Sequence, residues 1–205
     1  MNSLKKRFFR LLWLVLLLVG TDPCRRVEAA SAALEQLQTN IASLQRILTD
    51  PKLAGDEHLS QRRQLERSVL NEIFDFQEMS RRSLGRHART YADRLTEFTP
   101  LFVDFLEHAY MGLLEENGDA KIQYLKEVAS GGNVEVRTKT KIKDGSEHTV
   151  DYRLFQSGPG WRAYDIVVDD ISLVNNYRSQ FDRVLNKKSF DDLLQELREK
   201  KSSFN

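Results

Sequence analysis

The sequence predicts an α+β fold in which helices wrap a twisted, four-stranded antiparallel sheet. Up to about residue 116, the apolar residues recur at spacings of three and four, which is the pattern of amphipathic helices. Over residues 121–168 the chain changes to short alternating or β-forming segments separated by glycine-containing turns. A final helical pattern follows the sheet, so helices can cover it from both parts of the chain.

The N-terminus predicts a signal peptide over residues 1–29. A basic head within residues 5–10 directly precedes an apolar run over residues 11–19. This run has about half of the roughly 20 apolar residues that a membrane-spanning helix needs. We therefore expect an exported chain whose mature part, residues 30–205, is a single domain with its own core.

Cysteine usage and charge exclude two classes of protein. Cys24 is the only cysteine and lies inside the predicted leader, so the mature chain would depend on its core and not on disulfides. Without residues 1–29, acidic residues slightly outnumber basic ones, and no clustered basic excess is present. The sequence therefore lacks the electrostatic footprint of a nucleic-acid-binding protein.

Three amphipathic helices are expected before the sheet. The first covers residues 32–48 and ends at the following aspartate–proline pair. The second covers residues 59–76, and the third covers residues 91–116 with Pro100 inside it, which predicts a kink or a new helix start. The charged side of the second helix is expected to face solvent and consists of Arg62, Arg63, Glu66 and Arg67.

The four expected strands form an antiparallel meander, because each turn between them is short. In the second strand apolar and polar residues alternate, which predicts one face covered by helices and one face in solvent. The strands are expected at residues 121–128, 134–143, 148–155 and 161–168.

Asp169 and Asp170 interrupt an otherwise apolar stretch between the last strand and a helix expected over residues 171–185. Successive side chains of a strand point to opposite faces, so the two carboxylates cannot face one substrate together. We expect them to cap that helix and to interact favourably with its dipole. A short helix over residues 190–200, with Ser189 in a capping box, ends the chain.

Motifs of catalytic chemistry are missing from the sequence. The four histidines lie far apart, with no pair or cluster spaced for zinc. There is no Gly-x-Ser-x-Gly elbow, no glycine-rich phosphate loop and no cysteine nucleophile in the mature chain. We therefore expect no enzyme activity, no catalytic residues, no metal and no cofactor.

Apolar residues of the third helix are expected to meet apolar residues of the sheet. On the helix these are Phe98, Phe102, Phe105, Leu106 and Tyr110. On the sheet they are Val136, Tyr152, Leu154, Ile166 and Val168. From the residues alone, this surface can be an ordinary packed core or the lining of a cavity.

Four stretches, in order along almost the whole mature chain, carry a resemblance to a known family. They are FDFQEMSRRSLG (74–85), EFTPLFVDFLEHAY (97–110), VDYRLF (150–155) and WRAYDIVVDDISLVNNYRSQF (161–181). These stretches resemble the MlaC family of periplasmic phospholipid-binding proteins, also described as toluene-tolerance auxiliary proteins. The resemblance implies a helix-wrapped sheet around a deep hydrophobic pocket, in which the ten apolar residues named above would contact phospholipid acyl chains.

The resemblance also implies partners, and this chain departs from the family pattern at two positions. The family carries phospholipid between an outer-membrane lipoprotein complex and an inner-membrane ABC transporter with an MCE ring, which maintains the lipid asymmetry of the outer membrane; we expect a monomer. The family often has an aromatic residue where this chain has Ala88, and a glycine where it has Asp170. Neither position is needed for an apolar pocket, so both departures bear on local turn geometry and on partner choice.

Asp165 lies on the last strand with Trp161, and we expect it to pair with Arg178 of the following helix and so to tie helix to sheet. Two other functions remain open. One is an isomerase or hydrolase that uses Asp165 with Tyr152 or Tyr164 in an apolar pocket. The other is a helical adaptor that binds proteins. Some basic side chains can contact a lipid phosphate or an acidic partner, or form a solvated sheet face: Lys139, Lys141 and Arg153.

Overall fold

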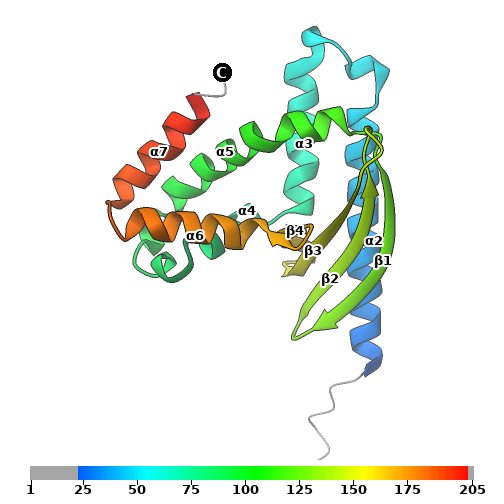
Figure 1. Cartoon of the computed structure of the whole chain (residues 1–205). Coiled ribbons are helices and arrows are strands. Elements are labelled where there is room, and N and C mark those ends of the chain that lie inside the picture. Colours follow the sequence, from blue (N-terminus) through cyan, green and yellow to red (C-terminus); the bar gives the residue numbers. More distant parts are fainter. Residues whose placement is uncertain (1–22, 203–205) are drawn as a thin grey trace, which may run out of the picture.

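The computed structural model describes residues 23–202, and it confirms the α+β class (Figure 1). Within these residues no helix is both long enough and apolar enough to cross a bilayer. Of the predicted signal peptide, residues 1–22 lie outside the described residues. The helices before the sheet are α2 (Pro23–Leu48), α3 (Leu59–Ile73), α4 (Phe76–Leu84) and α5 (Leu95–Glu116).

The sheet has five strands and not the predicted four, because a two-residue strand follows the last predicted one. The strands are β1 (Lys121–Ser130), β2 (Asn133–Lys141), β3 (Glu147–Ser157), β4 (Gly160–Val168) and β5 (Ile171–Ser172). Two helices follow, α6 (Leu173–Leu185) and α7 (Phe190–Ser202). The strands pair in the order β1-β2-β3-β4-β5, and every pair is antiparallel, so the expected meander is confirmed.

The register of the sheet defines two faces. Tyr152 of β3 lies opposite Val136 of β2 and opposite Ile166 of β4, so these residues share one face, here called the inner face. The neighbouring positions Arg153 and Asp165 point to the other side, here called the outer face. Helix α2 packs on the inner face, as the alternation in β2 predicted.

Helix α2 and the inner face form one buried cluster, here called the sheet cluster. Gln36 of α2 fixes the position of the helix, because its side chain accepts a hydrogen bond from Trp161 N at 2.9 Å and donates to Trp161 O at 3.0 Å. The buried members of the cluster are Ala33, Leu37, Ile41, Leu44, Ile73, Val134, Val136, Leu154 and Ala163.

Helices α4 to α7 form a second buried cluster, here called the helical cluster. Figure 1 shows these helices extending to the side of the sheet that lies away from β1. Edge-to-face aromatic contacts dominate the packing; the rings of Phe102 and Tyr177, for example, are 5.2 Å apart. The buried members are Leu84, Ala88, Phe98, Phe102, Phe105, Leu106, Tyr177, Phe181, Phe190, Leu193, Leu194 and Leu197.

The second predicted helix, residues 59–76, corresponds to α3 alone, and α4 was not predicted; the chain breaks at Phe74 and Asp75, and a new helix begins. Phe74 has an extended backbone and forms an isolated β-bridge with Ala163. Asp75 then caps α4, since its side chain accepts a hydrogen bond from Glu78 N at 2.8 Å. Helical spacing continues through this segment, so the pattern of apolar residues hides the break.

Asp169 and Asp170 form the turn between β4 and β5, so the prediction that they cap a helix is wrong. Both residues have positive φ angles, 46° and 67°, as a two-residue type I′ hairpin turn requires. The N-cap of α6 is Ser172, which lies beyond the hairpin. Two residues of strand therefore separate the acid pair from the helix.

Asp169 stabilises the neighbouring strand. Its carboxylate accepts a hydrogen bond from Thr149 N at 2.9 Å and lies 2.7 Å from His148 Nδ1. The hydrogen bonds from His148 and Thr149 hold the pKa of Asp169 below its ordinary value. The role of Asp169 in this structure is to join the β4–β5 turn to the start of β3.

Candidate functional site

Helix α5 contributes to both buried clusters, and the incompletely buried apolar residues near its C-terminal end and on the sheet are the candidate site. In the N-terminal part of α5, the side chains of Phe98 and Phe102 are almost fully buried against α6 and α7. Further along the helix, Leu114 packs against the sheet cluster instead.

Seven of the ten apolar residues expected to meet lie in or against two separate clusters, and three belong to neither. Phe98, Phe102, Phe105 and Leu106 lie in the helical cluster, while Val136 and Leu154 lie in the sheet cluster with α2. Direct packing of the first set on the second was therefore the wrong expectation. Four of the ten are not fully buried: Tyr110, Tyr152, Ile166 and Val168.

These incompletely buried residues mark where apolar surface stays open. Tyr110 of α5 is 41% exposed, and Val168 at the end of β4 is 40% exposed. Leu113, which neighbours Leu114 on α5, is 58% exposed. We call this set the α5–sheet surface; it groups incompletely buried apolar residues of α5 and of the sheet, none of which lines the groove between α6 and α7 described below: Tyr110, Leu113, Leu114, Tyr152, Ile166 and Val168.

Two tyrosines place polar groups within apolar surroundings. Tyr110 Oη lies 3.1 Å from Tyr177 Oη, so a hydrogen bond joins α5 to α6 beside the helical cluster. Burial, and then the hydrogen bond to Tyr110, raise the pKa of Tyr177, while burial and the nearby Tyr124 raise the pKa of Tyr152. Both phenols stay neutral at physiological pH and suit an uncharged, apolar ligand.

Asp165 is engaged on the outer face, away from Tyr152. Its carboxylate pairs with Arg153 at 3.1 Å and accepts hydrogen bonds from Ser172 Oγ at 2.7 Å and Val174 N at 3.0 Å. Asp165 and Tyr152 therefore lie on opposite sides of the sheet and do not form one site.

The expected pairing of Asp165 with Arg178 is wrong. Arg153 lies directly opposite Asp165 in the β3–β4 ladder, so Arg153 forms the ion pair with this carboxylate. Arg178 instead donates through Nε to the carbonyl oxygen of Arg82, at 2.9 Å, and so adds a second hydrogen bond to a carbonyl that already accepts from Gly85 N at the C-terminal end of α4. Asp165 still ties helix to sheet, through Val174 at the start of α6.

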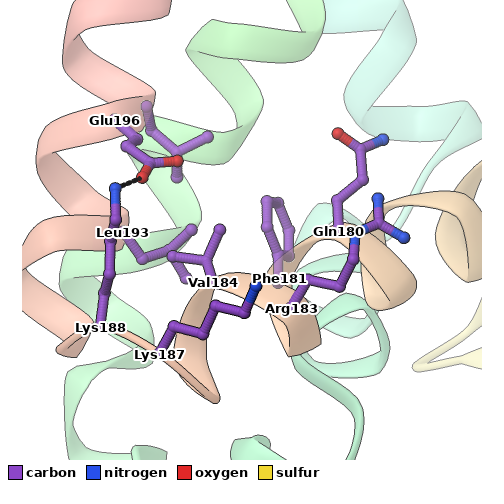
Figure 2. A pocket seen from close by; sticks show the side chains of 9 residues that line it. Gln180, Phe181, Arg183, Val184, Lys187, Lys188, Leu193 and Glu196 are labelled. Atoms are coloured by element: carbon purple, nitrogen blue, oxygen red, sulfur yellow. Dashed lines mark hydrogen bonds and ion pairs between the residues drawn. The ribbon is translucent and has the colours of Figure 1, made fainter.

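A groove between α6 and α7 was not predicted from the sequence (Figure 2). It has a volume of about 360 Å³, and its apolar floor belongs to the helical cluster. Lys188 at its rim pairs with Glu196 at 2.8 Å. The lining residues are Gln180, Phe181, Arg183, Val184, Lys187, Lys188, Leu193, Glu196 and Leu197.

Glu66 is fully buried, so its expected place on a solvated helix face is wrong. Neither carboxylate oxygen has a hydrogen-bond partner within residues 23–202, and Arg62 Nε lies 3.6 Å away. Burial, and then the charge of Glu115 on α5, raise the pKa of Glu66. The helical spacing of α3 does contain a signal for this, because Glu66 lies four residues before Leu70 and seven before Ile73, on the apolar face of the helix.

The part of the chain that the structure describes holds no group of acidic, histidine or cysteine side chains arranged to bind a metal ion. The α5–sheet surface contains the phenols of Tyr110 and Tyr152, and Asp165 lies on the opposite face of the sheet, where it pairs with Arg153. The arrangement is suited to binding an apolar ligand.

Comparison with known proteins adds two findings. A family model described as the MlaC protein matches residues 38–199. Among solved structures, the chain is similar to a phospholipid-binding protein from Ralstonia solanacearum in complex with a phospholipid, with 25% identity and a TM-score of 0.74. That alignment covers 84% of this chain and 98% of the other. No curated protein sequence matches the chain.

Proposed function

The chain belongs to the MlaC family, and from this premise we propose that it is a periplasmic carrier that binds a phospholipid and moves it between the outer and inner membranes. The resemblance seen in the sequence is thus confirmed at the level of the family. The observation that carries the proposal is the phospholipid in the Ralstonia solanacearum structure, since this chain matches 98% of that protein.

In this proposal the α5–sheet surface holds the acyl chains. Tyr110, Tyr152, Ile166 and Val168 contact the lipid directly, because they are the predicted lining residues that the two clusters leave incompletely buried. The remaining predicted lining residues support these from behind, within the clusters: Phe98, Phe102, Phe105, Leu106, Val136 and Leu154.

The free energy of transferring an acyl chain explains why such a carrier needs no covalent chemistry. Moving an acyl chain of about 16 carbons from water into an apolar site is worth roughly 13 kcal/mol, at about 0.8 kcal/mol per methylene. A bilayer offers the same chain nearly the same stabilisation. The carrier therefore only has to stabilise the acyl chain about as much as the membrane does. Docking to a partner then determines whether lipid enters or leaves the carrier.

The location and partners in this proposal follow the family. Residues 1–29 would direct export and then be removed, which leaves a monomeric carrier in the periplasm. Its partners would be an outer-membrane lipoprotein complex and an inner-membrane ABC transporter with an MCE ring. Through them the carrier would help to maintain the lipid asymmetry of the outer membrane.

Native mass spectrometry of the mature protein, purified from a Gram-negative host, tests this function. We expect a folded monomer whose mass includes a diacyl phospholipid that organic extraction then releases. A folded, monomeric protein without lipid would contradict the carrier function. Lipid-free protein that co-purifies with another protein would favour an adaptor instead.

A further inference from the structure

The outer face of β1 and β2 brings cations directly opposite one another. In the ladder between these strands, Lys121 lies opposite Lys141, and Lys126 lies opposite Arg137. Like charges at directly opposed positions of a sheet destabilise it. All four side chains are exposed, and α2 covers only the other face of these strands.

The acids of the outer face neutralise only some of these cations. Asp151 of β3 forms a bidentate pair with Arg137, with distances of 2.6 to 3.0 Å. Glu147 binds Lys139 at 2.6 Å, so Lys141, which lies opposite Glu147, shares a carboxylate that is already occupied.

Two lysines of β1 remain uncompensated. Within residues 23–202, neither Lys121 nor Lys126 forms an ion pair or a side-chain hydrogen bond. The uncompensated positive charge therefore lies along β1 and the adjacent end of β2.

Apolar side chains lie among these lysines. The ladder is irregular between Tyr124 and Lys126, where Leu125 has no opposite residue and is 48% exposed. Val128, further along the same strand, is 42% exposed. The irregularity makes two consecutive residues of β1 accessible, a leucine and a lysine.

Protection of a sheet edge does not account for this arrangement. Lysines and bulges on an edge strand prevent another chain from pairing with it. This explains Lys126 and the irregularity beside it, because β1 is an edge strand. It does not explain Lys141, which lies on β2 between two other strands and directly opposite Lys121.

The kind of cation indicates the kind of partner. Protein–protein interfaces are depleted in lysine, and docking onto carboxylates favours the bidentate arginine side chain. Here the arginines Arg137 and Arg153 are neutralised by acids, and the uncompensated cations are lysines. Flexible point charges next to exposed apolar side chains suit the phosphates and the interface of an anionic bilayer.

We propose that the outer face of β1 and β2 docks this protein on membranes that contain anionic phospholipid. The docking residues are Lys121, Lys126 and Lys141, with Leu125 and Val128 entering the interface. Figure 1 shows β1 at the side of the molecule opposite α7. Docking through the outer face of β1 and β2 does not cover Tyr152, Ile166 and Val168, the sheet residues of the proposed cargo site, which belong to the other face.

Vesicle flotation tests the docking surface. We expect the wild-type protein to float with vesicles of phosphatidylcholine and phosphatidylglycerol at low salt, and to stay behind with phosphatidylcholine alone. Replacing Lys121, Lys126 and Lys141 with glutamine should weaken binding about fivefold for each lysine, and on the order of 100-fold for all three. Binding should also fall as salt is raised, because the attraction is screened.

The matched control removes the same charge elsewhere. Arg89, Arg183 and Lys187 are exposed and form no ion pair among the described residues. Replacing these three with glutamine should change vesicle binding by less than threefold. If both triple variants lose affinity equally, binding reflects net charge and the proposed surface is wrong.

Two further results would overturn the proposal. One is a wild-type protein that does not bind the anionic vesicles. The other is a wild-type protein that binds poly-glutamate but not vesicles, which would assign this face to an acidic protein. The phospholipid content of each purified variant is measured separately, so a failure of the carrier function and a failure of the docking surface give different results.

Discussion

Arg153 of β3 pairs with Asp165 of β4 across the outer face, with Arg153 Nη1 3.1 Å from Asp165 Oδ2. The same carboxylate holds Ser172 and Val174, where β5 turns into α6. One buried acid therefore joins the sheet to the first turn of a helix in the other cluster. This junction fixes the direction in which α6 leaves the sheet.

The first prediction concerns this junction. Asp165→Ala should lower the free energy of unfolding by about 2 to 3 kcal/mol, because it leaves a buried backbone N–H at Val174 without an acceptor. Urea unfolding measures the change. Arg178→Gln is the control and should cost about 1 kcal/mol or less, since it removes a single exposed hydrogen bond. Equal losses in both variants would mean that Asp165 does not have this role.

The second prediction concerns the β4–β5 turn. Asp170→Gly should raise the free energy of unfolding by about 0.5 to 1 kcal/mol, because glycine adopts the φ of 67° without the steric cost that an L side chain has there. Thermal and urea unfolding measure the gain. Asp169→Gly should instead lower stability, because it removes the acceptor of Thr149 N. A destabilised Asp170→Gly protein would show that the Asp170 side chain holds the turn. Neither change should alter lipid content.

The third prediction concerns the pH dependence of stability. Since the pKa of Glu66 in the folded protein lies above its ordinary value of 4.5, the folded state binds more protons than the unfolded state between the two values. Stability should therefore fall as pH rises through this window. Urea unfolding at a series of pH values should show that Glu66→Gln is more stable than wild type at neutral pH and similar below pH 4.5.

The control for Glu66 is its neighbour Glu115. Glu115→Gln removes a charge that raises the pKa of Glu66, so the upper end of the window should move to lower pH. Wild type and Glu66→Gln with parallel pH profiles would contradict the assignment.

The fourth prediction separates the cargo site from the packed core. Val168→Asp should fold with little loss of stability, because Val168 is already partly exposed, and should lose most of its co-purified phospholipid. Leu154→Glu should fail to fold, since an unpaired charge in the buried sheet cluster costs several kcal/mol. Unfolding curves and organic extraction with mass spectrometry measure the two properties.

Leu65→Asp is the matched control for Val168→Asp. Leu65 is 39% exposed but lies on α3, so the variant should keep its full lipid load. A Val168→Asp protein that also keeps its full load would show that Val168 does not contact the cargo.

The sequence was sufficient to predict those elements whose pattern of residues is local. The meander could be predicted because three short turns leave no other pairing for four successive strands. β5 could not, since two residues carry no alternation. The end of α3 was predicted three residues too late, because Phe74 pairs with Ala163, which is far away in the sequence, and α4 was not predicted.

The candidate site depends on tertiary packing, most of which the spacing of residues in the sequence does not show. The pattern identified the apolar face of α5, but not that Phe98 packs in the helical cluster while Leu114 packs against the sheet cluster. The partner of Asp165 follows from the register of β3 on β4, and this register includes an irregularity at Arg153 and Leu154. Burial of Glu66, in contrast, could have been predicted, because Glu66 shares a helix face with Leu70 and Ile73.

The division of the core into two clusters affects the order in which the chain can fold. Each strand of the meander pairs with the next strand in the sequence, so the loops between them are short and their closure costs little conformational entropy. The helical cluster instead joins α4 and α5 to α6 and α7, which the whole sheet separates in the chain. Once the sheet has formed, it brings these two pairs of helices close together and shortens the loop that they must close. A slow-forming sheet would therefore delay the helical cluster as well.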